Sequence, residues 1–167
     1  GAVIRLVELR DSALWDRWLF AFIRTELDDG TAQEYFLPLD IAWEDPEENF
    51  RRVEPLVARA ANSGARLVAL PEMFATGFSM RSQAMAGHAE ATRRFLADLA
   101  TGSQAWIVAG LAEAGETRPA NACVIYAPTG AETLHYRKIH PFTLAGEPEH
   151  YEPGETLQTV TIEGLRV

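Results

Sequence analysis

Short apolar runs recur along the chain from residue 66 onward. Arg66–Leu70 and Ala105–Leu111 are almost wholly apolar, which is typical of strands buried on both faces of a sheet, most often a parallel one. Asn121–Ala127 and Ala131–Lys138 flank the turn sequence Pro128-Thr129-Gly130, and this pattern predicts a β-hairpin. Further on, the alternating segment 157–162 predicts one more strand.

Two stretches repeat apolar residues at helical spacing. The first begins at Asp45-Pro46, with Asp45 expected as the N-cap and Pro46 at the first helical position, and it should end near Gly64. Pro55 removes a backbone hydrogen bond inside this helix, so we expect a kink or a restart near residues 51–55. The second helix is predicted over His88–Ala100. Together with a strand from about residue 37, the order β-α-β-α-β-β-β predicts a layered α/β fold.

The first 43 residues are predicted to be rich in β-structure. Ala2–Leu9 is one expected strand. Trp18–Leu27 and Gln33–Trp43 are apolar and aromatic, and Asp28-Asp29-Gly30-Thr31 separates them. Because Asp-Gly between two such runs favours a tight turn, the two runs are predicted to form a hairpin.

Charge and cysteine usage limit the partners of the chain. With 24 acidic and 15 basic residues the net charge is −9, which argues against nucleic acid and anionic membranes as partners. No run is long enough to span a membrane, and no signal peptide is visible. The single cysteine, Cys123, allows no internal disulfide, so we expect a reducing, cytoplasmic location.

Four scattered histidines and the absence of a phosphate loop predict neither a metal nor a cofactor.

A carboxylate follows the first buried strand. In LVALPEMFATGFSM the proline, Pro71, should end the strand, and Glu72 comes directly after it between apolar residues. The crevice outside strand ends is where α/β proteins bind ligands. Apolar surroundings raise the pKa of a carboxyl toward the range useful for proton transfer. Glu72 is therefore a candidate general base; the alternative is a carboxylate that caps the next helix or pairs with a basic residue.

Two later motifs add a lysine and a second carboxylate. In HYRKIHPF, Lys138 stands at the end of a predicted strand, where its ammonium could stabilise a developing oxyanion. In AGEPEHYEPG, Glu147 follows nine positions later and would keep the lysine charged and oriented. The alternatives are a surface Arg-Lys pair at a hairpin end and an acidic loop, since Glu149 and Glu152 are close by.

The motifs LPEMF, YRKIHPF and GEPEHYEPG together resemble the carbon–nitrogen hydrolase (nitrilase) superfamily. The likeness is closest to its ω-amidase-like branch, in which TGFSM also follows the glutamate. It covers roughly residues 37–167 and includes DIAWEDPEENF, and Asn121 with the turn that follows it. The resemblance implies an α/β fold, the N-terminal portion of an αββα sandwich. We therefore expect an incomplete sandwich over residues 37–167, preceded by a β-rich extension over residues 1–36.

The resemblance also implies a function. Members of the family hydrolyse amides with a cysteine nucleophile, and the matching motifs make Glu72 the general base, Lys138 the lysine at the tetrahedral intermediate and Glu147 the second carboxylate. The nucleophile should follow Lys138 in a motif like ICYD, whereas this sequence ends at TIEGLRV. Cys123 precedes Lys138 within a predicted strand, and we interpret it as a small buried hydrophobe. We thus expect a hydrolase of small carboxamides whose nucleophile is missing from this chain, so that the chain alone is inactive.

A second resemblance concerns the N-terminus. Residues 1–45 are similar to the N-terminal cap of bacterial maltokinases, and the two likenesses overlap at residues 37–45. One strand there cannot be both a hairpin edge and a buried parallel strand. The alternative function is accordingly a non-catalytic module for binding or assembly, and a composite without function of its own also stays open. Half a sandwich would expose an apolar sheet face, so we expect homo-oligomers.

Overall fold

The computed structural model describes residues 6–15, 18–26 and 32–167. Its central sheet has the strand order β4 (Leu67–Ala69), β5 (Trp106–Glu113), β6 (Ala120–Tyr126) and β7 (Glu132–Arg137). β4 and β5 pair in parallel and the other pairs are antiparallel. The sequence therefore predicted these four strands and the β6–β7 hairpin correctly, and the sheet is mixed.

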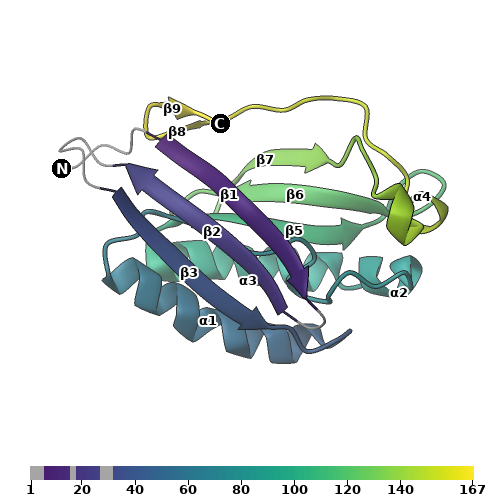
Figure 1. Cartoon of the computed structure of the whole chain (residues 1–167), viewed down its shortest axis with the longest axis horizontal. Coiled ribbons are helices and arrows are strands. Elements are labelled where there is room, and N and C mark those ends of the chain that lie inside the picture. Colours follow the sequence, from purple (N-terminus) through teal and green to yellow (C-terminus); the bar gives the residue numbers. More distant parts are fainter. Residues whose placement is uncertain (1–5, 16–17, 27–31) are drawn as a thin grey trace.

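Two long helices cover one face of this sheet (Figure 1). α1 (Pro46–Asn62) and α3 (Ala89–Ser103) pack their apolar sides onto the strands, and the contact forms the largest hydrophobic core. Burial of this core is the main source of stability for the layer. Fully buried members include Val57 of α1, Leu96 of α3 and Ile107 of β5.

The ends of α1 follow the sequence signals. The Asp45 carboxylate accepts a hydrogen bond from the backbone N–H of Glu48 at 3.1 Å, and Pro46 is the first helical residue. At the other end Gly64 adopts a positive φ of 95°. Its N–H donates to the carbonyl of Ala61, while the N–H of Ala65 reaches back to Ala60. This pair of bonds is a Schellman motif, so the predicted stop at Gly64 is confirmed.

Pro55 does not divide the helix. α1 continues from Pro46 to Asn62 without interruption, so the expected restart near residues 51–55 is wrong. Pro55 is exposed, whereas Val53 and Val57 on either side of it are buried. The missing hydrogen bond therefore falls on the solvent side, where water can satisfy the free carbonyl, and the packing of the buried side holds the helix together.

A second sheet precedes α1. It consists of β1 (Leu6–Trp15), β2 (Trp18–Glu26) and β3 (Ala32–Asp40), all antiparallel. The predicted β2–β3 hairpin is confirmed, although its turn lies outside the described residues. Of the predicted strand Ala2–Leu9, residues 6–9 lie in β1, and residues 2–5 lie outside the described residues. β3 lies beside α1 (Figure 1), and Arg52 bonds to Asp40 at the end of β3.

The strand near residue 37 is therefore a hairpin edge. β3 pairs with β2 along its whole length, from Glu26 opposite Ala32 to Trp18 opposite Asp40. Its pairing is with β2 in the separate sheet, and the central sheet runs from β4 to β7. This resolves the conflict at residues 37–45 and corrects the prediction that the first strand of the β-α-β series belongs to the layered sheet.

Smaller elements complete the chain. The sequence missed α2 (Ser82–Ala86), a single short turn of helix, and the predicted strand at 157–162 is reduced to β8 (Thr161–Ile162), which pairs with β9 (Leu165–Arg166). Ile162 packs against Leu67 and Ile125 on the sheet face opposite the helices. η1 (Thr143–Ala145) and α4 (Glu147–His150) follow β7.

Within the described residues no helix is long and apolar enough to cross a membrane. The same residues contain no group of three or more His, Cys, Asp and Glu side chains that could hold a metal ion.

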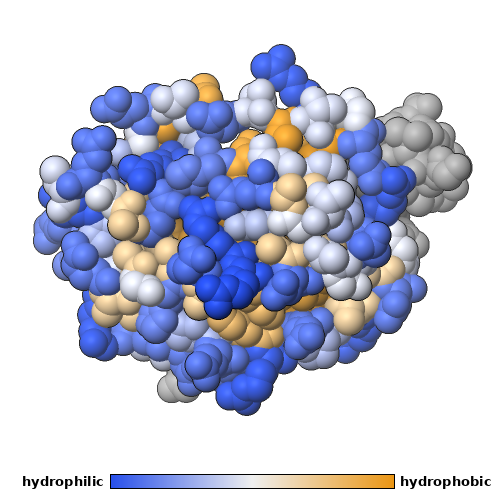
Figure 2. All heavy atoms as spheres, turned by 180° about the vertical axis from the view of Figure 1, so that it is seen from behind, coloured by the Kyte–Doolittle hydropathy of each residue, from blue (hydrophilic) through white to orange (hydrophobic). Residues whose placement is uncertain are grey.

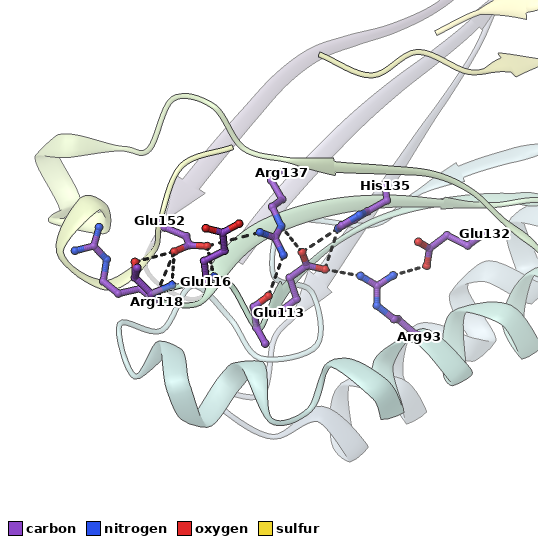
Figure 3. A network of polar contacts seen from close by, with 10 residues as sticks. Arg93, Glu113, Glu116, Arg118, Glu132, His135, Arg137 and Glu152 are labelled. Atoms are coloured by element: carbon purple, nitrogen blue, oxygen red, sulfur yellow. Dashed lines mark hydrogen bonds and ion pairs between the residues drawn. The ribbon is translucent and has the colours of Figure 1, made fainter. Parts of the chain in front are cut away.

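A network of charges joins α3 to β5 and β7 (Figure 3). The nearly buried carboxylate of Glu113 accepts hydrogen bonds from Arg137 at 2.7 Å and from Arg93 of α3 at 2.5 Å, and it contacts His135 at 2.9 Å. Arg93 also bonds to Glu132. Burial opposes the charge on Glu113, but its cationic partners outweigh this and hold the pKa of the carboxyl below 4.5.

Glu152 continues this network toward the loop after β5. Its carboxylate accepts hydrogen bonds from the backbone N–H groups of Thr117, Glu116 and Arg118, which lower its pKa to about 2. The carboxylate thereby ties the β5–β6 connection to the segment that follows α4 (Figure 3).

We predict that Glu113→Gln lowers the free energy of unfolding by about 1.5–3 kcal/mol at pH 7, because charged hydrogen bonds are lost. Since folding depresses the pKa of Glu113, its contribution is complete above pH 4.5 and disappears as the pH falls through the folded-state value. Urea unfolding between pH 7 and pH 3 should show the two proteins converging at acid pH. Glu90→Gln, an exposed change on α3, should have little effect; a constant difference between Glu113→Gln and its parent at all pH values would contradict the account.

Candidate active site

Glu72 lies in a turn directly after β4. The turn is tight: Phe74 donates its N–H to the carbonyl of Pro71, and Met73 adopts a positive φ of 54°, which side chains other than glycine rarely take. Met73 and Phe74 are completely buried, whereas the Glu72 side chain is 44% exposed. The expected apolar surroundings of Glu72 are therefore wrong, because the turn directs its apolar neighbours inward and its carboxylate outward.

A glycine on the neighbouring strand allows this turn to approach. A Cβ atom on Gly110 of β5 would lie 2.8 Å from the Cα atom of Glu72 and 3.0 Å from the backbone nitrogen of Met73. Real Cβ atoms essentially never come so close to backbone atoms. Because Gly110 has no side chain, the turn that carries Glu72 can pack directly against β5.

Lys138 follows β7 and points at two carboxylates. Its Nζ atom donates to Glu72 Oε1 at 2.9 Å and to Glu147 Oε2 at 2.9 Å. The ammonium also lies 5.3 Å from the centre of the Phe78 ring, within the range of a cation–π interaction. Burial disfavours the charged lysine, but the hydrogen bonds to Glu147 and Glu72 outweigh it, and the pKa of Lys138 is raised above 10.5.

Glu147 is the first residue of α4 and is completely buried. Its carboxylate accepts hydrogen bonds from Asn121 Nδ2 at 2.8 Å, from the backbone N–H of Phe142 at 2.5 Å and from Lys138. Burial raises the pKa of Glu147, but these donors outweigh it and leave the pKa below 4.5. By contrast Glu149 is exposed, so Glu147 differs from the acidic residues beside it.

The loop around Glu147 is attached to the turn around Glu72. Tyr151 is completely buried, its N–H donates to the carbonyl of Glu147, and its hydroxyl donates to the carbonyl of Ser79 at 2.6 Å. Ser79 in turn donates its hydroxyl to Glu44. Two segments that are far apart in the sequence are thus held together at the site.

The structure brings all three predicted residues together. Glu72, Lys138 and Glu147 come from three different segments and form one hydrogen-bonded cluster. The alternative interpretation of Glu72 was a carboxylate that pairs with a basic residue. Glu72 does form such a pair, and its partner is Lys138, the residue predicted as the catalytic lysine. The N-cap residue of α2 is Arg81, and no side chain forms a capping hydrogen bond at this end of the helix. Glu72 therefore does not cap α2.

Sequence reasoning assigned no role to Asn121. The residue is buried in β6, and its Nδ2 atom lies 2.5 Å from Glu72 Oε1 as well as 2.8 Å from Glu147 Oε1. The sequence did contain a signal for such a role, since Asn121 is a polar residue in the otherwise apolar strand β6. Such a residue needs hydrogen-bond partners when it is buried.

Cys123 lies two residues further along β6 and is partly buried. Burial, together with the negative charge of Glu72, raises the pKa of its thiol to about 11. At neutral pH only about one thiol in ten thousand would be ionised. Since the thiolate is the nucleophilic form, Cys123 is poorly suited to attack a substrate.

Comparison with known proteins gives this cluster a context. The profile of the family described as carbon–nitrogen hydrolase matches residues 34–163. The chain belongs to this family. A nitrilase from Pyrococcus abyssi is 35% identical over 117 residues, which are 66% of this chain and 44% of the relative. An omega-amidase from Yersinia enterocolitica is 28% identical over 76% of this chain and 48% of its own length.

Solved structures of carbon–nitrogen hydrolases share the fold. An amidase from Nesterenkonia sp. AN1 matches with a TM-score of 0.70 at 22% identity, over 75% of this chain and 51% of that chain. A CN-hydrolase superfamily protein from Xanthomonas campestris matches with a TM-score of 0.67 at 27% identity, over 75% of this chain and 47% of that chain. The chain thus spans about half the length of these relatives. The comparisons do not support the similarity of residues 1–45 to a maltokinase cap.

We predict that Gly110→Ala displaces the turn at Glu72 and lowers the free energy of unfolding by about 1–3 kcal/mol, because the added methyl group meets backbone atoms. Amide NMR shifts of Glu72 and Met73 should change together with the urea midpoint. Gly102→Ala is the matched control: apart from the backbone of its own helix and its chain neighbours, no atom lies within 4 Å of the added Cβ, so it should be neutral or stabilising by up to about 1 kcal/mol. Equal effects of the two changes would contradict the assigned role of Gly110.

Proposed function

We propose that this chain supplies the general base, the lysine and the second carboxylate of an amidase that hydrolyses carbon–nitrogen bonds in small carboxamides. The observation that carries this proposal is the ammonium of Lys138, which is hydrogen-bonded to Glu72 on one side and to Glu147 on the other. Membership of the carbon–nitrogen hydrolase family and similarity to omega-amidases support it.

Lys138 would stabilise the charge that develops on the substrate oxygen. An ammonium has three N–H donors, and in the described part of the chain two of them bond to Glu72 and Glu147. The third can donate to the oxyanion of a tetrahedral intermediate. Because this oxyanion exists only after attack, the interaction lowers the barrier and does not merely bind the substrate.

Glu72 would move the proton. Its Oε1 atom accepts from Lys138 and from Asn121, whereas no described residue donates to its Oε2 atom. One oxygen is thus held in place and the other can take a proton from a thiol, pass it to the leaving amine and later activate water. The exposure of Glu72 gives a substrate access to this oxygen.

The nucleophile in this proposal is a cysteine outside the 167 residues. The partly buried position and raised pKa of Cys123 argue against it as the nucleophile. The Nesterenkonia amidase carries a cysteine at its active site, to which acrylamide adds, and this chain matches about half of that enzyme.

Further features are expected of the same protein. We propose that it acts in the cytoplasm, where cysteines such as Cys123 stay reduced, and that residues 1–36 form an extension of the hydrolase domain. Self-association is also proposed, because large apolar side chains such as Phe142 and Leu144 are exposed. On the face opposite to that of Figure 1, hydrophobic residues come to the surface between predominantly hydrophilic ones (Figure 2).

Ammonia release from a panel of small ω-amides tests the proposal, with the 167-residue chain run beside the full-length product of its gene. We expect release by the full-length protein and none by the chain alone. Glu72→Gln should lower kcat by about 10²–10⁴-fold and Lys138→Met by about 10²–10³-fold, because a proton carrier and an oxyanion donor are removed. Glu149→Gln, an exposed change near Glu147, and Cys123→Ser should leave kcat unchanged.

Two outcomes would overturn parts of this proposal. Activity of the 167-residue chain that Cys123→Ser abolishes would show that the nucleophile is Cys123. If neither the 167-residue chain nor the full-length protein released ammonia, the amidase proposal would be overturned. The alternative function, a non-catalytic module for binding or assembly, would then be favoured.

A further inference from the structure

One residue contacts all three members of the proposed catalytic cluster. The Asn121 side chain lies within hydrogen-bond distance of Glu72 and of Glu147, and its backbone carbonyl accepts the N–H of Lys138 at 2.8 Å. Asn121 is buried, with 4% of its surface exposed. No other residue described in the structure bonds to Glu72, Lys138 and Glu147 at once.

The chemistry of an amide suits this position. Ionised carboxylates only accept hydrogen bonds, so the NH₂ group of Asn121 must face them, and its two N–H bonds can serve one carboxylate each. An amide also adds no charge between two anions. An aspartate there would add a third negative charge, and an alanine would leave Lys138 as the only group that bridges Glu72 and Glu147.

We propose that Asn121 is a positioning residue of the site, which joins Glu72 to Glu147 and holds one oxygen of Glu72 so that the other faces the substrate. The inference rests on the proposed amidase function. It assigns no contact between Asn121 and the reacting atoms. Its effect passes through the orientation of Glu72 and through the charge of Glu147.

The low pKa of Glu147 is consistent with this role, since a hydrogen bond from Asn121 is, after the opposing effect of burial, the largest contribution to it. Removal of the amide should therefore be visible in the titration of Glu147 even in a protein without activity. This gives the inference a test that does not depend on catalysis.

The first experiment titrates Glu147 by carboxyl ¹³C NMR in the 167-residue chain. Asn121→Ala should raise the pKa of Glu147 toward 4.5, whereas Asn62→Ala, an exposed change at the end of α1, should not change it. An unchanged pKa of Glu147 in folded Asn121→Ala would overturn the inference. Thermal unfolding of each variant shows whether it is folded.

The second experiment measures kcat, KM and their pH dependence in the full-length protein. Asn121→Ala should lower kcat by about 10–100-fold with little change in KM. Asn121→Asp keeps the shape of the side chain and is decisive if the alanine variant does not fold. Ionised aspartate cannot donate, while the protonated form can, so the ratio of its kcat to that of the parent should rise as the pH is lowered.

Each result of the second experiment bears on a defined claim. A pH-independent ratio for Asn121→Asp, or a kcat within twofold of the parent for Asn121→Ala, would overturn the positioning role. Absence of activity in the parent itself would overturn the proposed function, and the NMR titration of Glu147 would still decide whether Asn121 organises the cluster.

Discussion

The site depends on one ammonium group between two carboxylates. Lys138 lies 2.9 Å from both Glu72 and Glu147, and the charges stabilise one another. Burial acts against the charged forms of Lys138 and Glu147, as it does for any ion taken out of water. The hydrogen bonds outweigh this cost for Lys138, whose pKa rises, and for Glu147, whose pKa falls. Both shifts favour the charged forms of Lys138 and Glu147, and the chemistry proposed for the site requires these forms.

The three groups come from separate segments of the chain. Each is held in position by local packing or by local hydrogen bonds. The tight turn at Met73 and the bare backbone at Gly110 place Glu72. The backbone N–H of Lys138 donates to the carbonyl of Asn121 in β6, and the carbonyl of Lys138 accepts from the N–H of Gly154. Glu147 is held by the backbone N–H of Phe142, and the buried Tyr151 attaches its loop to the loop after Glu72. The positions of the three groups are thus set by packing and by hydrogen bonds that involve the backbone.

Much of this arrangement was predictable from the sequence. The apolar runs of β4 and β5, the turn at Pro128-Thr129-Gly130 and the Asp45 cap were local signals, and the structure follows them. Three motifs in order were enough to select Glu72, Lys138 and Glu147. The role of Asn121 and the exposure of Glu72 could not be predicted, because both depend on which side chains meet across strands. The position of β3 also depended on pairing, since an apolar run alone does not show whether its partner is β2 or the central sheet.

The pKa of Lys138 is the most direct test of the central claim that this lysine is bound between two carboxylates. It can be followed in the 167-residue chain by the ¹³C shift of the lysine Cε atom during a pH titration. The account predicts a value above 10.5 that falls in Glu72→Gln, because one of the two anionic partners is then lost. A value at or below 10.5 that does not respond to Glu72→Gln would contradict the account, since Lys138 would then be an ordinary surface lysine.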